Sequence, residues 1–512
     1  MGRRDRRRRI RRGRCRGGHA RPLPRRALLT VRPHLKLLEP ALLDRILEEA
    51  FVLLDRPGVR VAGAEARRLL EAAGASVSDG VARIPGDVVR NALALAPREF
   101  FLHDRSGVAR VRYGGDSVQF DPGSSCVHVL DGDTGRRREA VSEDLVRLVR
   151  LCEALPEYDA QSTALVCADV PKEIGDVYRL LLVLRHSDKP IVTGSFTADA
   201  VAPMVALLVA DAGGETGLRR RPRAIFDVCP SAPLHWSEFA CDGLVALARA
   251  GVPAEIVSVP LAGATAPATL AGAAALHAAE TLAGIAIAQL AAAPAPVVWG
   301  GAPAIFDMRT GMAPMGAIET SMLDLACAEI GKHLGLPTHA YLGGSDAKLL
   351  DAQAGMESAQ GLLLGALGGI NMISGAGMLD FLACQSLEKL VVDAEAIASA
   401  RRLLDGVSAP AGSLAVAMFA KTGLAGEFLK LPETRRLFRL EQHLPSAVVD
   451  RASLRAWEDS GSRDIAARAR TRVRELLSVD RRGGPDPERE RARLAVVAPL
   501  AARAGLDGLP AA

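Results

Sequence analysis

Residues 254–301 read AEIVSVPLAGATAPATLAGAAALHAAETLAGIAIAQLAAAPAPVVWGG, and this stretch decides the fold class. Short apolar runs lie at its two ends, AEIVSVP (254–260) and PVVWGG (296–301), and both are too apolar for a half-exposed strand. Between them, apolar residues recur at the three- and four-residue spacing of an α-helix. The stretch therefore predicts two buried parallel strands joined by a helix.

The same alternation repeats along the chain from about residue 160. The other apolar runs, each followed by a helical pattern or the next linker, are TALVCAD (163–169), PIVTGSF (190–196), AIFDVCP (224–230), THAYLGG (338–344) and INMISGAG (370–377). A series of this kind over roughly 250 residues predicts an α/β protein, and a (β/α)8 TIM barrel rather than an open sheet. The candidate eighth strand is SVQFDPG (117–123).

Composition and pattern divide the chain into five predicted segments. These are a disordered Arg-rich arm (1–34), an N-terminal α+β region (35–135), the TIM-barrel catalytic domain (136–405), a helical C-terminal extension (406–480) and a loose tail (481–512). Residues 1–32 hold fourteen Arg and one Asp, a charge of +13 in a chain of net charge +5, so the rest carries −8. The arm could bind nucleic acid, but an acidic body favours a disordered extension, and we expect no nucleic-acid partner.

Cysteine usage and hydropathy indicate the compartment. The eight Cys form no C-x-x-C pair, and their spacing fits neither a zinc site nor a disulfide framework. Most of them are expected to be buried thiols in a reducing compartment, with Cys229 held apart from this expectation. Every apolar stretch near the ~20 residues of a membrane span is interrupted by Gly, Pro or charge. We therefore predict a cytoplasmic protein with no membrane and no resident metal.

The ends of the predicted strands are where a barrel gathers its functional residues. In chain order these positions offer Asp227, Cys229, His235 and Trp236, then Gly263 and Thr265, then Trp299, Gly300, Gly301, Phe306, Asp307, Arg309 and Glu319, then Tyr341, Gly343, Gly344, Asp346 and Lys348, and finally Asn371 and Ser374. No H-E-x-x-H, P-loop or dinucleotide fingerprint occurs in the right setting.

Several of these positions have a structural alternative. The paired glycines also fit tight strand-to-helix turns, and Asp307 with Arg309 also fits an ion pair that fixes a loop. Lys348 could form a Schiff base if it were desolvated, but the neighbouring carboxylates favour a charged, paired lysine. Cys229 could line the cavity or be an inert buried thiol. Residues alone indicate a barrel enzyme that acts on a small molecule.

Three stretches resemble the trimethylamine methyltransferase family. They are the run from PLAGATAPATLAG to IFDMRTG (260–311), DAKLLDAQAGMES (346–358) and EFLKLPETRRLFRLEQHLPSAVVDR (427–451), and the similarity extends from about residue 30 to 480. The resemblance implies a (β/α) barrel that moves a methyl group from a methylated amine to the cobalt of a partner corrinoid protein. Founding members carry pyrrolysine, whereas this sequence holds only the twenty standard residues. It therefore resembles the non-pyrrolysine branch, some members of which demethylate quaternary amines such as glycine betaine.

Under this resemblance the protein holds the amine and the corrinoid performs the attack, so we predict no catalytic side chain. A quaternary ammonium is best held by aromatic faces and carboxylates. The predicted substrate-binding residues are His235, Trp236, Trp299, Phe306, Asp307, Arg309, Glu319, Tyr341, Asp346 and Asn371. Those predicted to meet the corrinoid are Gly263, Thr265, Gly300, Gly301, Gly343 and Gly344. The expected partners are a small methylated amine, a cognate corrinoid protein and further copies of the chain.

Two other functions stay open at this point. A Schiff-base lyase or aldolase would use Lys348, and a non-catalytic barrel would bind a methylated amine or a corrinoid without turnover.

Overall fold

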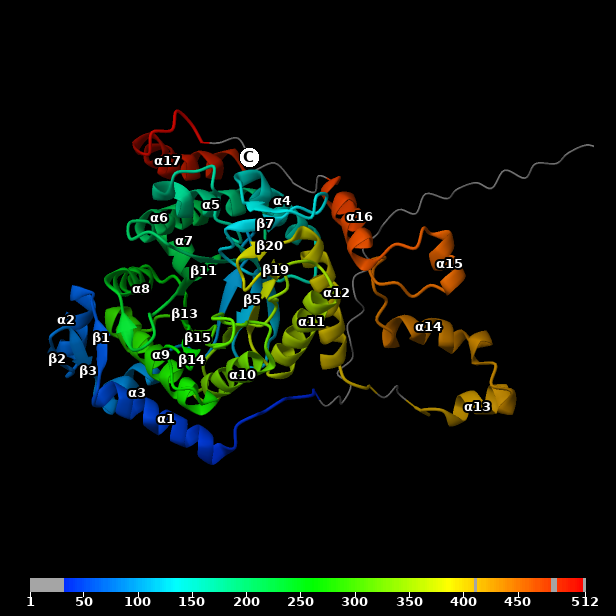
Figure 1. Cartoon of the computed structure of the whole chain (residues 1–512), viewed down its shortest axis with the longest axis horizontal. Coiled ribbons are helices and arrows are strands. Elements are labelled where there is room, and N and C mark those ends of the chain that lie inside the picture. Colours follow the sequence, from blue (N-terminus) through cyan, green and yellow to red (C-terminus); the bar gives the residue numbers. More distant parts are fainter. Residues whose placement is uncertain (1–31, 409–411, 480–485, 510–512) are drawn as a thin grey trace, which may run out of the picture.

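The computed structural model describes residues 32–408, 412–479 and 486–509, so nearly all of the predicted Arg-rich arm lies outside the described residues. Two parallel sheets form the centre of the protein (Figure 1). The larger contains, in spatial order, β15 (Val297–Gly301), β13 (Ala254–Ser258), β11 (Ala224–Val228), β10 (Ile191–Gly194) and β9 (Gln161–Ser162). The smaller contains β17 (His339–Tyr341), β18 (Met372–Ala376) and β6 (Gln119–Pro122). The predicted α/β class is confirmed.

The edges of the two sheets lie next to one another. On one side Trp299 and Thr338 form a parallel bridge between β15 and the residue before β17. On the other side the backbone amide of Asp159 donates to the carbonyl of Phe120 in β6, at 2.9 Å. The predicted eighth strand, 117–123, therefore pairs with β18 in the structure. The predicted run 163–169 is displaced: β9 ends at Ser162, and Leu165 instead bridges Cys126.

Helices surround the strands on the outside (Figure 1). They are α4 (Ser142–Ala154), α5 (Lys172–His186), α6 (Val201–Ala212), α7 (Glu215–Arg220), α8 (Glu238–Ala250), α9 (Leu270–Ala292), α10 (Ile318–His333), α11 (Ala352–Leu367) and α12 (Leu387–Leu404). Their starts are set by local chemistry, because Ser237, Asp351 and Ser386 each accept a backbone N–H at an N-cap. Thr269 caps α9 in the same way, accepting from the amide of Gly272 at 3.2 Å.

Helix α9 is buried on nearly every side, which explains why its sequence is so poor in charge. The N-terminal helices α1 (Pro40–Asp55), α2 (Ala64–Ala72) and α3 (Gly86–Leu95) pack against its outer face. Its two ionisable residues, His277 and Glu280, are both fully buried. Within the described residues it is the one helix long and apolar enough to cross a membrane, and 83% of its apolar window is buried inside the protein. A packed core helix accounts for these properties.

Small sheets surround the central strands. One contains β12 (His235–Trp236), β1 (Val59–Val61), β3 (Val81–Arg83) and β2 (Ser76–Ser78), and another contains β19 (Met378–Leu379), β20 (Cys384–Gln385), β7 (His128–Leu130) and β8 (Arg137–Glu139). Two-stranded pairs are formed by β4 (Phe100–His103) with β5 (Ala109–Tyr113), and by β14 (Leu261–Ala262) with β16 (Ala304–Ile305). The β4–β5 hairpin matters most for the site, since it reaches the inner faces of the central sheets.

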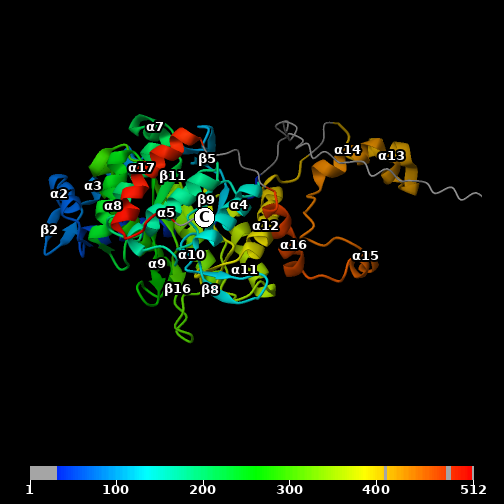
Figure 2. The same cartoon turned by 90° about the horizontal axis from the view of Figure 1, so that it is seen from above.

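The C-terminal part has two kinds of helix. In α13 (Val416–Thr422), α14 (Pro432–Glu441) and α15 (Leu454–Asp459) no residue is buried among the described residues, and these helices stand apart from the body (Figures 1 and 2). By contrast, α16 (Ile465–Leu477) packs on α4 and α12.

The segment predicted as a loose tail, 481–512, instead contains α17 (Pro487–Arg503), which packs on α5 and α6. Buried Arg493 fixes α17 by pairing with buried Asp211. That long-range ion pair is the physical reason for the difference, because the polar local sequence alone favours disorder.

Candidate functional site

The inner faces of the two parallel sheets carry an apolar layer toward the amino ends of the strands. This layer is a separate hydrophobic cluster that contains Ala160, Val192, Ile225, Val298 and Met372 together with Leu102, Val111 and Tyr113 of the β4–β5 hairpin. The hairpin therefore closes this end with apolar side chains. Because side chains alternate along a strand, residues two positions further on face the same interior. Those positions include Asp227, Gly300 and Ser374.

Asp227 and Glu255 form the centre of a polar layer above the apolar one. They are register partners on the adjacent parallel strands β11 and β13, so their side chains lie side by side. In addition to desolvation, the negative charge of Asp227 therefore acts directly on Glu255 and raises the pKa of that acid. Tyr113 donates to Oε1 of Glu255 at 2.6 Å, and Tyr341 donates to Oδ2 of Asp227 at 3.1 Å. The Tyr341 hydroxyl also shares a 2.7 Å hydrogen bond with Ser124.

A second chain of polar groups crosses the same layer. The hydroxyl of Ser374 on β18 donates to Oδ1 of Asp121 on β6 and lies 3.0 Å from Nε2 of His339 on β17. His339 contacts Tyr341 edge to face, with ring centroids 5.1 Å apart. Nε2 of His339 is also 3.8 Å from Oε2 of Glu255, so the two chains of polar groups meet.

Burial dominates the electrostatics of this cluster. Desolvation raises the pKa of Asp121 and of Glu255 well above the ordinary carboxyl value, and the negative charge of Asp227 raises that of Glu255 further. The pKa of Asp227 is also raised by desolvation, although its hydrogen bonds act in the opposite direction. Desolvation lowers the pKa of His339 to about 3, so this imidazole is neutral at pH 7.

Hydrogen bonding in the cluster is incomplete. Counting only partners among the described residues, Oδ2 of Asp121, Oδ1 of Asp227, Oε2 of Glu255 and Nδ1 of His339 are buried and have none. Buried polar atoms without partners are costly, and their concentration at one place is typical of a site that takes up a ligand. No group of three or more His, Cys, Asp and Glu side chains suited to a metal ion occurs in the described part of the chain.

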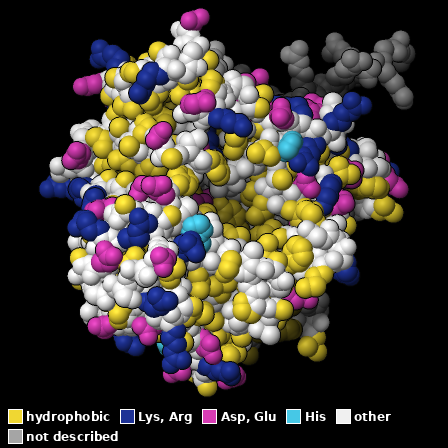
Figure 3. Space-filling view, turned by 60° about the vertical axis from the view of Figure 1, so that its left-hand side comes forward, with side chains coloured by type: hydrophobic (Ala, Val, Ile, Leu, Met, Phe, Trp, Pro, Cys, Tyr) yellow, Lys and Arg dark blue, Asp and Glu magenta, His cyan; other side chains and the backbone are white. Residues whose placement is uncertain are grey.

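The cluster opens toward the carboxyl ends of the strands. Asp227 is partly accessible to solvent, and Cys229, two residues further along the same strand direction, is exposed. Desolvation and the Asp227 charge raise the pKa of the Cys229 thiol to about 12. A space-filling view shows a hollow near the middle of one face, bordered mainly by hydrophobic and uncharged atoms (Figure 3).

Of the predicted site residues, the structure brings Tyr341 and Gly300 into this layer. Tyr341 joins it through the hydrogen bonds given above, and a Cβ on Gly300 would lie 3.2 Å from Nδ1 of His339. The two predicted tryptophans do not join it. Trp299 packs against Gly331 of α10, and Trp236 packs against Gly284 of α9, so both rings point to the outer helical layer. Asn371 binds the carbonyls of Gly114, Gly115 and Ser117 at the amino end of β18.

The loop after β16 holds the predicted residues Phe306, Asp307 and Arg309 and extends beyond the body (Figure 2). Asp307 and Arg309 form the local ion pair, with two 3.0 Å hydrogen bonds, and Arg309 is exposed. That pairing lowers the pKa of Asp307 to about 2. Asp346 accepts from the amides of Met315 and Gly316, and so fastens the base of this loop.

The remaining predicted residues lie around this loop or outside the polar layer. Glu319 is exposed in the first turn of α10, and His235 is half-buried in β12, where its backbone pairs with Ser231. Thr265 accepts from the amide of Leu261 inside the turn that Gly263 opens. A Cβ on Gly301 would collide with His277, one on Gly343 with the backbone of Ala376, and one on Gly344 with Leu382. These three glycines, Gly301, Gly343 and Gly344, thus have a packing role.

Lys348 is exposed rather than desolvated. Its Nζ donates to the carbonyl of Asp346 at 2.7 Å, lies 3.7 Å from Asp380, and sits over the ring of Phe381. A nucleophilic lysine needs a sheltered, desolvated site, and exposed Lys348 does not lie in one.

Sequence reasoning missed Asp121, Glu255, His339, Tyr113 and Ser124. Glu255 and Asp121 nevertheless left a signal, because each is the single charged residue of a run that was predicted as a central strand. Burying a lone acid in such a position costs folding free energy, so the acid is usually paired or serves a function. Tyr113 left no such signal, since it reaches the site from the N-terminal hairpin.

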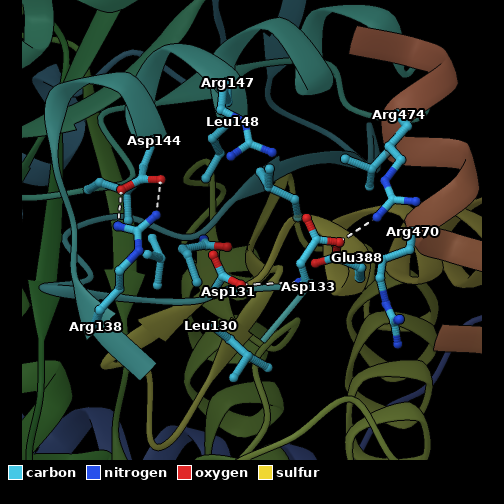
Figure 4. A pocket seen from close by; sticks show the side chains of 16 residues that line it. Leu130, Asp131, Asp133, Arg138, Asp144, Arg147, Leu148, Glu388, Arg470 and Arg474 are labelled. Atoms are coloured by element: carbon cyan, nitrogen blue, oxygen red, sulfur yellow. Dashed lines mark hydrogen bonds and ion pairs between the residues drawn. The ribbon is translucent and has the colours of Figure 1, made fainter. Parts of the chain in front are cut away.

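A second pocket, between the β7–β8 turn, α4, α12 and α16, is distinct from the polar layer (Figure 4). Its charges largely neutralise one another. Arg138 makes a two-point ion pair with Asp144, and Arg474 pairs with Asp133. These contacts hold α16 against the body, so we assign this pocket a structural role.

The fold and the polar layer define a class: an α/β protein with a buried acidic site at the carboxyl ends of parallel strands. The family described as "Trimethylamine methyltransferase (MTTB)" matches residues 2–502. The chain belongs to the trimethylamine methyltransferase family.

Curated relatives are similar over most of their length. Trimethylamine methyltransferase MttB2 of Methanosarcina mazei is 32% identical over 432 residues, which is 83% of this chain and 87% of that protein. Glycine betaine methyltransferase of Desulfitobacterium hafniense is 27% identical over 458 residues, 89% of this chain and 95% of that protein. The second relative supports the predicted non-pyrrolysine branch, and methyltransferase relatives support an enzyme.

Among solved structures, the monomethylamine methyltransferase MtmB of Methanosarcina barkeri matches with a TM-score of 0.45 and 14% identity, over 85% of this chain and 94% of that one.

Proposed function

We propose that this protein transfers a methyl group from a methylated amine to the corrinoid of a separate partner protein. The observation that carries the proposal is the pair Asp227–Glu255, an acidic pair on adjacent parallel strands in a member of a methyltransferase family. Buried carboxyl groups favour a cationic ligand, and a methylated ammonium is such a ligand.

We further infer that the eight parallel strands close into a (β/α)8 barrel whose mouth is this site. The Trp299–Thr338 bridge and the Asp159–Phe120 hydrogen bond support closure on both sides. A closed barrel with apolar side chains at its amino end leaves the carboxyl end as the entrance, as the fold requires.

A quaternary amine is the substrate class that fits these residues best. Loss of a methyl group from a quaternary ammonium leaves a neutral tertiary amine, so no proton has to be delivered to the leaving group. The protein must hold the cation, orient one N-methyl group outward and exclude water. In this proposal Tyr341 presents an aromatic ring and the carboxyl pair supplies negative charge, and Phe306, Asp307 and Arg309 on the loop after β16 remain our proposed contacts for the outer part of a substrate.

The corrinoid, carried by its own protein, supplies the reduced cobalt that accepts the methyl group. The rim near the entrance is rich in exposed apolar side chains on the β16–α10 loop and the starts of α10 and α11: Met308, Met312, Ile318, Met322, Leu349 and Met356. Exposed apolar patches mark protein–protein contacts, and methionine adapts to different partners. Gly263 and Thr265 are small residues, so we expect the neighbouring turn to project little into the path of the corrinoid. A reduced corrinoid also suits the reducing cytoplasm predicted from the cysteines.

The test is a methyl-transfer assay. Purified protein is mixed with a corrinoid-binding protein reduced to Co(I) and with a panel of methylated amines, and formation of methyl-cobalt is followed by absorbance. Transfer from at least one quaternary amine is expected. Binding of an amine without any transfer would instead support the non-catalytic barrel. The Schiff-base alternative has lost its support, because Lys348 is exposed and paired.

A further inference from the structure

Asp227 and Glu255 each have one carboxyl oxygen that accepts a hydrogen bond and one that does not. Tyr113 donates to Oε1 of Glu255 and Tyr341 donates to Oδ2 of Asp227, while Oε2 of Glu255 and Oδ1 of Asp227 have no donor among the described residues. The two residues are register partners on adjacent parallel strands, so their carboxyl groups lie side by side. Two ionised carboxylates at such positions repel each other, and as acceptors they cannot satisfy one another's oxygens. A single proton between the two carboxyl groups gives both of the remaining oxygens a hydrogen-bond partner.

We propose that Asp227 and Glu255 share a single proton, that Asp227 is the ionised member, and that the resulting single negative charge holds a monovalent organic cation. The charge belongs on Asp227 because this residue is partly accessible to solvent, whereas Glu255 is fully buried. Glu255 is then a positioning residue that keeps the Asp227 carboxylate facing the entrance. This inference rests on the proposed function for the identity of the cation, a methylated ammonium group.

The other charged and titratable groups around the pair do not change its single negative charge. Desolvation raises the pKa of Asp121 and so opposes its ionisation, while His339, with a pKa of about 3, is neutral and Cys229, with a pKa of about 12, is a thiol. Tyr113 and Tyr341 keep their protons, because burial and the neighbouring acids raise the pKa of both phenols. Arg179 is the nearby cation, but its guanidinium pairs with Asp176 at 3.0 Å and donates to two backbone carbonyls. One unit of negative charge therefore remains for a ligand.

The site accordingly discriminates between ligands by their charge first and by their shape second. A monocation neutralises the pair, whereas a neutral isostere leaves the Asp227 charge buried without a partner. A zwitterionic amine can bind only with its ammonium group inside and its carboxylate toward the entrance, since a carboxylate inside would face the charge on Asp227.

Binding of tetramethylammonium and of choline to the full chain tests the proposal by calorimetry. Tetramethylammonium has no titratable proton, so any proton exchanged comes from the protein. We expect the same heat in phosphate and in Tris at pH 7.5, which means no net proton release. We also expect choline to bind at least tenfold more tightly than 3,3-dimethylbutan-1-ol, its uncharged isostere.

Two conservative variants separate the roles of the two acids. Asp227→Asn should weaken tetramethylammonium binding at least tenfold, because the charge is lost. Glu255→Gln should change it by less than threefold, because the amide donates to Asp227 as the protonated acid does. Asp133→Asn, an exposed acid that pairs with Arg474, is the matched control and should bind as the wild type does. Thermal melting verifies that each variant is folded.

A measurement on the wild type keeps the proposal testable even if a variant does not fold. Affinity for tetramethylammonium should be constant above the ionisation of Asp227 and should fall tenfold per pH unit below it, the slope of one proton. Equal losses in both variants, release of a proton on binding at pH 7.5, a slope of two protons, or no cation binding would each overturn the proposal. Cation binding with the expected asymmetry but without methyl transfer would leave it standing and overturn the proposed function. Methyl transfer together with equal losses of cation binding in both variants would overturn this proposal and leave the proposed function standing.

Discussion

The Tyr341 hydroxyl donates to Asp227 at 3.1 Å while it shares a 2.7 Å hydrogen bond with Ser124, so one phenol connects strands β17 and β11 with the loop after β6. The aromatic ring lies beside the acid that we infer to be ionised. This relationship makes Tyr341 both an orienting donor and a surface for the substrate.

Tyr341→Phe should therefore keep the ring and lose the donor. A hydrogen bond to a charged group is worth about 1.5–3 kcal/mol, so kcat/KM for methyl transfer should fall about tenfold to a hundredfold. Steady-state kinetics with the best amine substrate measures this loss. An unchanged kcat/KM would show that the hydroxyl does not orient Asp227.

Gly300→Ala should narrow the site. Its Cβ would lie 3.0 Å from the carbonyl oxygen of Ile256 and 3.2 Å from Nδ1 of His339, so the polar layer must shift. We expect a destabilisation of about 1–3 kcal/mol and weaker amine binding. Gly355→Ala on α11, where a Cβ meets no atom within 4 Å among the described residues, is the control and should be neutral or slightly stabilising. Denaturant unfolding and calorimetry measure the two effects.

Asp121→Asn should flatten the dependence of stability on pH. The folded pKa of Asp121 is raised well above 3.8, so between 3.8 and that value the unfolded chain loses a proton that the folded protein retains. This acid therefore lowers wild-type stability as the pH rises, by about 1.4 kcal/mol per pH unit. Relative to the wild type, the variant should gain stability as the pH rises above 3.8. A parallel pH profile for both proteins in urea unfolding would contradict the assignment.

Arg493→Ala should test whether α17 belongs to the folded body. Arg493 is buried and donates to Asp211 at 2.9 Å, and its removal leaves that acid with Arg223 as its remaining ion-pair partner in the described part of the chain. Breaking a buried pair costs about 3 kcal/mol or more. Arg472→Ala, which breaks the exposed pair with Glu475, should cost no more than about 0.5 kcal/mol. Equal unfolding free energies for the two variants would refute the role of α17.

The succession of strands and helices could be predicted from the sequence because apolar periodicity is local. The quoted stretch 254–301 indeed contains β13, α9 and β15, and Thr269 caps the helix. What periodicity could not tell is which face of a strand points inward. Both faces of a buried parallel strand are apolar, so Trp299 could be assigned to the interior when it in fact faces α10.

The remaining differences depend on contacts between distant parts of the chain. Trp236 lies in β12, which pairs with β1 from the N-terminal region, and Tyr113 reaches Glu255 from the β4–β5 hairpin. Neither contact has a signature in the local sequence. Glu255, in contrast, could have been recognised, because it is the one charged residue in AEIVSVP.

The most direct test of the central claim is the rate of methyl-cobalt formation from a quaternary amine by the wild type, Asp227→Asn and Glu255→Gln, with Asp133→Asn as the control. We predict transfer by the wild type and the control, a loss of at least tenfold in kcat/KM for Asp227→Asn, and a loss of less than threefold for Glu255→Gln. Transfer by Asp227→Asn at the wild-type rate would contradict the account, because the charge that is inferred to hold the substrate would then be dispensable.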